Sequence, residues 1–225
     1  MDSITQAALG AAIGQAGFRE LGRRALLFGA ICGTLPDLDS IVFGGADPWA
    51  RLVAHRGLSH SIVVLPFVAI PLGWVAWRVF GRKGTWLQWV HLAFWGLVTH
   101  PLLDTCTTYG TQLLAPFTDQ RFSWDSIAII DAFYTIPLLV ALGLGVRKSA
   151  PLPRAKAWAR GALIWGCIYL VAGWGASQIA KARFVSHLEA TGHTVVRART
   201  TVPALFPVLR HGVARLSTGA IATNT

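Results

Sequence analysis

The sequence predicts an all-α, polytopic membrane protein with about six membrane-embedded helices. Hydrophobic residues make up 53% of the 225 residues and charged residues 13%, and the mean hydropathy is +0.51, which is more apolar than a soluble domain normally is. Apolar segments also recur along the chain, and a helix needs about 20 apolar residues to cross a bilayer. The segments that are long enough or nearly so are 62–80, 86–103, 127–146 and 162–180, and two shorter ones are 4–17 and 25–36.

The two short segments are rich in glycine and alanine and could form a packed hairpin. Gly10 and Gly14 form a G-x-x-x-G step, which lets helix backbones approach closely in lipid. A cleaved signal peptide is the alternative for residues 1–17, but no basic residues precede the apolar run and Asp2 has the opposite charge. We therefore expect this segment to belong to the membrane domain.

The basic residues predict the orientation, because they cluster in alternate loops and the positive-inside rule places such loops in the cytoplasm. The N-terminus, residues 37–61, residues 104–126 and the chain after about 181 are then expected on the outer face. The reverse orientation would place five positive residues of one short loop outside. This placement also makes membrane lipids, and not nucleic acid, the expected partners of a chain with a net charge of +10. The three clusters are Arg19, Arg23 and Arg24; Arg78, Arg82 and Lys83; and Arg147, Lys148, Arg154, Lys156 and Arg160.

Two parts of the chain are expected: a helical membrane domain over residues 1–180 and a polar, basic tail over residues 181–225 on the extracytoplasmic side. The first part of the tail, Lys181 to Ala190, could continue the last helix. Three cysteines without C-x-x-C spacing predict free thiols that fill apolar space.

Two histidines bracket a glycine turn in the stretch 55–61. On one continuous helix His55 and His60 would point roughly 140° apart, so a shared metal ion requires a bend, which Gly57 permits. Ser59 is then the expected N-cap, with His60 on the first helical turn. The alternative is a polar loop with an ordinary N-cap.

Two other stretches place ionisable residues against apolar segments. Asp37 and Asp39 can present both carboxylates to one side of a turning chain. His100 and Asp104 are four residues apart and share one helix face, although Pro101 predicts a kink or a helix start. His91 lies about 180° round the helix from His100 and is left out of the site.

Three further residues are candidates on the same outer face. Asp131 lies a little over one turn into segment 127–146, which suits a metal ligand or the partner of a ligand histidine. Arg56 and Arg121 could hold a phosphate or carboxylate of a substrate, and lipid headgroup contact is the alternative for both.

Histidine nitrogen combined with carboxylate oxygen, without thiolate, suits a divalent ion. Zn²⁺ is the first expectation, and Mn²⁺ or Fe²⁺ are also suited. A water on such an ion becomes acidic enough to attack a phosphoryl or carbonyl centre. No nucleophilic serine motif or phosphate-binding loop competes for the chemistry.

The combined motifs resemble those of the YdjM-like family of predicted membrane-bound metal-dependent hydrolases, over about residues 1–140. The resemblance implies a bacterial inner-membrane protein with a metal centre and hydrolase activity. Many members have Thr-His where this chain has Thr5-Gln6, and an amide is a much poorer ligand. The motifs are Met1-Asp2-Ser3-Ile4-Thr5-Gln6, Leu35-Pro36-Asp37-Leu38-Asp39, His55-Arg56-Gly57 followed by His60-Ser61, His100 to Asp104, Tyr109-Gly110-Thr111, and Asp131 followed by Tyr134-Thr135-Ile136-Pro137. The implied ligands are Asp37, Asp39, His55, His60, His100 and Asp104.

Two functions follow from these expectations. One is a hydrolase with Asp37, His60 and Asp131 as catalytic residues, acting at the outer interface on a phospholipid or another lipid-linked ester. The other is a non-enzymatic protein that binds or transports a metal ion. Transporters place ligands near mid-membrane, whereas most of these lie near the ends of their segments, which favours the enzyme.

Overall fold

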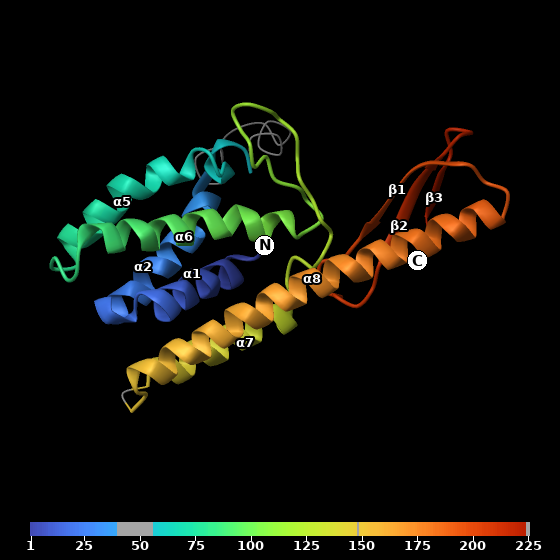
Figure 1. Cartoon of the computed structure of the whole chain (residues 1–225). Helices are drawn as coiled ribbons and strands as arrows, with labels where there is room; N and C mark the ends of the chain where they lie inside the picture. The colour runs from blue at the N-terminus through green and yellow to red at the C-terminus, as the bar shows by residue number, and fades with distance from the viewer. Residues whose placement is uncertain (40–55, 148, 224–225) are drawn as a thin grey trace.

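The computed structural model describes residues 1–39, 56–147 and 149–223 (Figure 1). Within these described residues, six α-helices lie on the six predicted segments, and a small sheet that the all-α prediction did not include follows the last of them. The helices are α1 (Ser3–Gly17), α2 (Arg23–Thr34), α5 (Leu65–Val79), α6 (Trp86–Thr105), α7 (Ala132–Gly145) and α8 (Leu152–Ala190). Short 3-10 helices are η1 (Arg19–Leu21), η2 (Leu35–Leu38) and η3 (Leu58–His60). The antiparallel sheet, in the order β1-β2-β3, contains β1 (Val195–Thr201), β2 (His211–Leu216) and β3 (Ile221–Thr223).

The described part of the chain is mostly helical, but the prediction of about six membrane-embedded helices is not supported. Within the described residues, α8 is the one helix whose length and composition suffice to cross a bilayer; α5 and α7 are apolar but have 15 and 14 residues. The predicted apolar segments are longer than these two helices, because polar side chains determine where each helix begins. Asp131 caps α7 by accepting from the backbone N–H groups of Phe133 and Tyr134. The Ser61 hydroxyl accepts from Val63 and Val64 just before α5 begins.

The predicted α1–α2 hairpin is confirmed, with backbone packed on backbone. A Cβ atom on Gly10 would overlap the carbonyl group of Gly29, and one on Gly14 would overlap that of Ala25. Gly10 and Gly14 therefore act as the G-x-x-x-G step predicts, since any side chain there would separate the two helices.

The hydrophobic core has two parts on either side of this hairpin. One lies between α2, α5 and α6 around Trp89 and Leu97, and the other between α1, α7 and α8 around Tyr134 and Leu138. The outward faces of α5, α7 and α8 expose large apolar side chains, as helices in contact with lipid do. Examples are Phe67, Trp74, Ile136, Ile168 and Val171.

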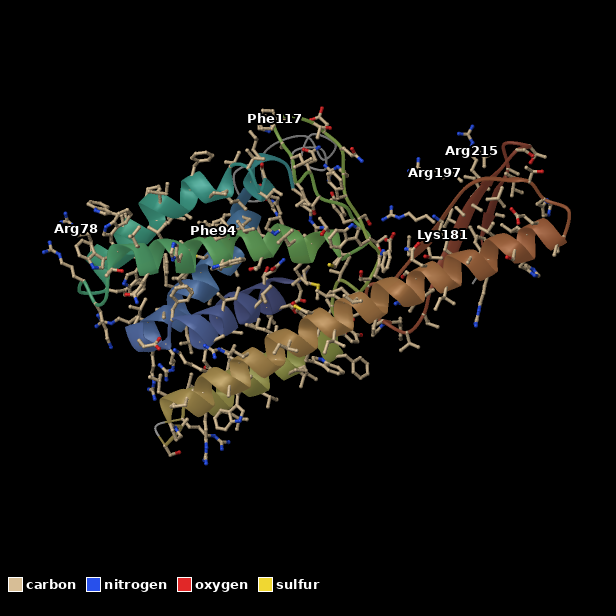
Figure 2. All side chains as sticks on the ribbon, viewed as in Figure 1. Arg78, Phe94, Phe117, Lys181, Arg197 and Arg215 are labelled. Carbon is tan, nitrogen blue, oxygen red and sulfur yellow. The ribbon has the colours of Figure 1, made fainter. Side chains whose placement is uncertain are left out.

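The loops that carry the predicted basic clusters meet at one end of the bundle, which we call the basic end. Arg23 donates to the carbonyl of Val146 at 2.7 Å. Arg24 donates to the carbonyl of Phe80 at 2.7 Å. Lys156 pairs with Glu20. Figure 2 shows Arg78 at this end, far from the sheet that carries Arg197 and Arg215. The opposite end, where η2, η3 and the C-terminus of α6 meet, is the site end.

The expected continuation of the last helix through Ala190 is confirmed, and the rest of the tail folds back onto it. Phe184 and Leu188 on α8 pack against Ala214 and Leu216 on β2. Arg199 on β1 forms an ion pair with Asp125, which joins the sheet to the loop after α6.

Candidate metal centre

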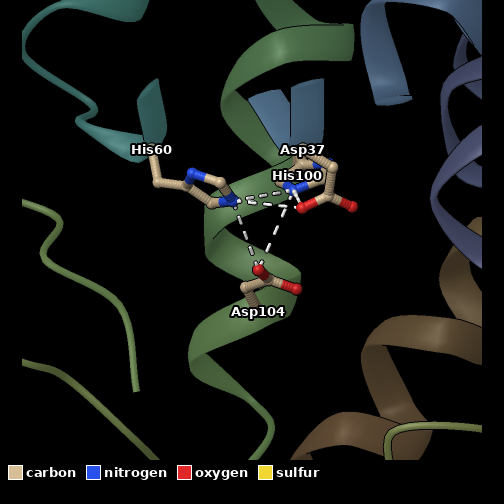
Figure 3. A group of neighbouring side chains, drawn as sticks. All are labelled: Asp37, His60, His100 and Asp104. Atoms are coloured by element: carbon tan, nitrogen blue, oxygen red, sulfur yellow. Dashed lines mark hydrogen bonds and ion pairs between the residues drawn. The ribbon is translucent and has the colours of Figure 1, made fainter. Parts of the chain in front are cut away.

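Four side chains converge at the site end, and we call them the inner group (Figure 3). Asp37 comes from η2, His60 from η3, and His100 and Asp104 from the last turns of α6. One donor atom of each lies within 4.8 Å of all the others. The side chains of His60, His100 and Asp104 are fully buried, whereas that of Asp37 is 22% exposed. Solvent therefore reaches the group on the side of Asp37.

The separations between the donor atoms suit a single metal ion. Nε2 of His60 and Nε2 of His100 are 3.1 Å apart. Oδ1 of Asp37 lies 3.3 Å from Nε2 of His100 and 3.5 Å from Nε2 of His60. Oδ2 of Asp104 lies 3.5 Å from Nε2 of His60 and 3.8 Å from Nε2 of His100. Four ligands about 2.0–2.1 Å from a tetrahedral Zn²⁺ lie ~3.3–3.4 Å from one another. The inner group thus has nearly the required size.

His100 and Asp104 lie on one face of α6, as the spacing predicts. The predicted helix start at Pro101 is wrong, because α6 continues through this residue to Thr105; the alternative, a kink at this residue, stays a prediction. The helix continues because α6 packs against α1, α2 and α5. This packing stabilises the helix although Pro101 has no backbone N–H to donate.

Hydrogen bonds outside the group set the tautomer of both histidines. Nδ1 of His100 lies 2.6 Å from the carbonyl oxygen of Gly33, which can only accept, so Nδ1 carries the hydrogen. The Ser59 hydroxyl donates to Asp39 at 2.6 Å and therefore accepts from Nδ1 of His60 at 2.9 Å. Both Nε2 atoms then direct lone pairs inward, toward two carboxylate oxygens. Four acceptors this close need a cation between them.

Asp39, a predicted ligand, lies behind His60 and outside the inner group. Its Oδ2 atom is 3.6 Å from Nδ1 of His60 and accepts from Ser59 and from the backbone N–H of Arg56. A carboxylate in this position orients a ligand histidine and increases its basicity. The predicted N-cap role of Ser59 is wrong, since its hydroxyl serves this chain of hydrogen bonds and α5 begins only at Leu65.

Asp104 is surrounded by cationic and amide groups, and the sequence did not predict their contact with this carboxylate. Its Oδ1 atom accepts from the α-amino group of Met1 at 2.5 Å and from Gln6 Nε2 at 3.1 Å. Its Oδ2 atom lies 3.0 Å from Nε of Arg56. Gln6 therefore presents its amide nitrogen to Asp104. The motif Met1 to Gln6 was the one available signal that the N-terminal segment belongs beside the site.

Charge interactions shift the pKa values of two members of the inner group, His60 and Asp37. Burial alone would lower the pKa of His60, but the carboxylates of Asp104 and Asp37 raise it above its ordinary value. Burial alone would raise the pKa of Asp37, but His100 and His60 hold it well below its ordinary range. Without a metal ion, the carboxylates of Asp104 and Asp37 therefore favour a proton on His60.

Comparison with known proteins identifies the family of this chain. A sequence model of the YdjM inner membrane protein family matches residues 1–184, which include every member of the inner group. The chain belongs to the YdjM inner membrane protein family. It is therefore a bacterial inner-membrane protein, and the YdjM match ends before the sheet begins at Val195.

Two relatives extend the YdjM comparison. The chain is 34% identical to "Inner membrane protein YbcI" of Escherichia coli (strain K12) over 134 residues, which cover 56% of this chain and 75% of YbcI. It is 24% identical to "Uncharacterized protein YfhP" of Bacillus subtilis (strain 168) over 162 residues, which cover 67% of this chain and 48% of YfhP. No solved structure matches the chain.

The remaining predicted site residues of this YdjM protein lie elsewhere. Asp131 is fully buried, caps α7 and accepts from the Tyr169 hydroxyl at 3.0 Å, so its oxygens serve helix packing outside the inner group. Arg121 is half-buried and lies 5.8 Å from the ring of Tyr109. His91, which was left out of the predicted site, is exposed and lies outside the inner group. His55, a predicted ligand, lies outside the described residues.

Arg56, predicted to bind substrate, is buried beside the inner group and stacks on Tyr109 at 4.7 Å. This position does not fit contact with lipid headgroups on an open surface. It brings a permanent positive charge next to Asp104, within reach of whatever the inner group binds.

Proposed function

We propose that this YdjM-family protein is a membrane-bound, metal-dependent hydrolase. The observation that carries the proposal is the convergence of four acceptor atoms. Two of them are histidine nitrogens, and hydrogen bonds to residues outside the inner group leave both nitrogens with a lone pair directed into the group. The separations favour tetrahedral Zn²⁺, and Mn²⁺ or Fe²⁺ remain suited to the same donors. The proposed ligands are Asp37, His60, His100 and Asp104.

The surrounding residues support phosphoester hydrolysis. When bound, the metal would supply a Lewis acid and an acidified water. Asp37 borders the open side, so its carboxylate can accept a hydrogen bond from a water that enters there and orient it. Asp39 and Ser59 keep the His60 ring oriented. A divalent ion balances the two inner carboxylates, and Arg56 then leaves the site positively charged, which favours an anionic substrate.

We also propose that the site end faces the extracytoplasmic side and that the substrate is a lipid or a lipid-linked ester. The support is that the basic loops meet at the opposite end of the bundle. Reporter fusions in the loop 147–151 should then report cytoplasm, and fusions near residue 120 should report the outer side. The reverse pattern would contradict this orientation.

Metal analysis of protein purified in mild detergent tests the centre. Wild-type protein should carry about one transition-metal ion per chain, and His60→Ala, His100→Ala or Asp104→Ala should remove most of it. His91→Ala is the matched control, because His91 lies on α6 with His100 but is exposed away from the group. Metal-free wild-type protein, or equal metal in all four variants, would contradict the site.

Activity is tested separately on phosphodiester and carboxylester lipids. Hydrolysis should increase as pH rises toward neutral and should stop when a chelator is added. A second function, metal binding without catalysis, is favoured by the complete burial of three of the four ligands. Metal that depends on the ligands, with no hydrolysis of any tested lipid, would select that function.

A further inference from the structure

A second site lies where the sheet meets the bundle. It is a cavity of about 530 Å³, which we call the basic cavity. Its lining joins the loop after α6, the C-terminal half of α8 and strand β1. Six side chains define its chemistry: Arg121, Lys181, Arg197, Arg199, Trp124 and Trp174. Figure 2 shows Lys181 on α8 and Arg197 on the adjacent sheet.

The basic cavity has more positive charge than its own acids neutralise. Asp125 is the one acidic residue among the described lining residues, and Arg199 engages both its oxygens at 2.9 Å. Arg199 also donates to the carbonyl of Thr108 at 2.6 Å. Lys181 and Arg197 have no acidic partner in the described part of the chain. An anion of suitable size would therefore be attracted to this cavity.

An apolar groove of about 470 Å³ adjoins the basic cavity. The two share Trp124 and Trp174, and the groove continues along α8 past Leu170 and Val171 to Cys106 and Cys167. A charged cavity that continues into an apolar groove matches an amphiphile, with an anionic head and a hydrocarbon chain.

The position along α8 agrees with a lipid. Residues 161–180 contain no charged side chain, whereas Arg160 precedes them and Lys181 follows them. Twenty helical residues span about 30 Å, the thickness of the hydrocarbon core. Lys181 then lies at the membrane–water interface, and Trp174 lies just inside it, where tryptophan is enriched. The groove along Leu170 and Val171 lies at the depth of the acyl chains.

We propose that the basic cavity and the apolar groove together bind one anionic phospholipid. The phosphate is held by Lys181 and Arg197, with Arg121 beside them, and an acyl chain follows α8 past Trp174. The proposal concerns binding alone and is independent of hydrolysis at the inner group. The bound lipid would nevertheless lie close to that group, because Cys106 in the groove follows Asp104 at the end of α6.

Lipid titration of the full chain in neutral detergent, followed by native mass spectrometry, tests the proposal. Phosphatidylglycerol should bind about tenfold more tightly than phosphatidylcholine with the same acyl chains. The double variant Lys181→Gln, Arg197→Gln should abolish this preference. Arg215→Gln should keep it, because Arg215 pairs with Arg197 across the sheet but does not line the cavity.

Soluble phosphate compounds, and a variant in the apolar groove, test whether the cavity binds a phospholipid or merely any phosphate. Inorganic phosphate and glycerol 1-phosphate should bind much more weakly than phosphatidylglycerol, and Trp174→Ala should weaken phosphatidylglycerol binding severalfold. Equal binding of inorganic phosphate, no preference for the anionic lipid, or an equal loss in Arg215→Gln would each overturn the proposal. The metal content and melting temperature of each variant serve as the check that it is folded.

Discussion

The inner group and the basic cavity have opposite chemistry: one is built from hydrogen-bond acceptors and the other from cationic donors. The inner group collects acceptors in a buried space, with two histidine lone pairs and two carboxylates directed at one point. The basic cavity collects donors in a partly open space, with Lys181 and Arg197 beside a carboxylate that Arg199 already engages. Each region suits an ion of the opposite sign, and we propose a metal cation for one and a lipid phosphate for the other. The YdjM match includes the first region and ends before β1 of the second.

The largest expected difference is in the cost of removing one acid from each region. In chelator-treated protein, Asp104→Asn should lower the free energy of unfolding by about 3–5 kcal/mol, because Arg56 is left as a buried charge without its partner. Asp125→Asn should cost about 1 kcal/mol or less, since the side chain of Arg199 is 46% exposed. Denaturation of both variants in one detergent measures the difference, and equal costs would contradict the contrast in burial.

The stability and metal affinity of the inner group should depend on pH. In the metal-free fold the pKa of His60 is raised, so its protonation stabilises the fold at low pH, and this contribution is lost as pH rises through that pKa. Metal binding needs Nε2 unprotonated, so metal affinity should fall by about tenfold per pH unit below the same pKa. Affinities measured between about pH 8 and about pH 6 check this. A flat profile would show that no proton competes with the metal.

A smaller effect is expected from the hydroxyl behind His60. Ser59→Ala removes the link between Asp39 and Nδ1 of His60, and loss of such a partner typically lowers metal affinity by about tenfold or more. The fold should remain, because Ser59 does not cap α5. Ser123→Ala is the matched control beside the basic cavity, where metal affinity should stay unchanged. An unchanged affinity in Ser59→Ala would contradict the orienting role.

The smallest expected effect is that of salt, which should weaken lipid binding at the basic cavity and leave the inner group unaffected. Raising the ionic strength from about 0.1 M to about 1 M shortens the screening length, so the preference for phosphatidylglycerol at the exposed cations should shrink severalfold. Metal bound by the inner group, three of whose four ligands are fully buried, should be retained. Titrations at both salt concentrations measure both quantities, and equal salt sensitivity would show that the two regions do not differ in exposure to solvent.

The sequence predicted the helices and much of the inner group because both depend on local patterns. Apolar segments placed the six helices of the described residues, and the four-residue spacing placed His100 and Asp104 on one face of α6. Helix ends depend on single polar contacts that segments do not reveal. Asp131 is one example: from the sequence it was expected inside a membrane segment, but it is the N-cap at which α7 begins. The sheet was missed because its strands alternate basic and small residues, as in the Arg197–Arg199 stretch, and resemble a polar tail.

The contact between α1 and α2 has a consequence for the chemistry of His100. A Cβ atom on Gly33 would overlap the carbonyl of Gln6, so the absence of a side chain there fixes how near the two backbones lie. The same Gly33 presents the carbonyl oxygen that receives the hydrogen of His100 Nδ1. A single added methyl group would therefore push that acceptor away and free the imidazole to place its hydrogen on the nitrogen that faces the inner group. A helix-packing distance thus selects which ring nitrogen can donate electrons to a metal.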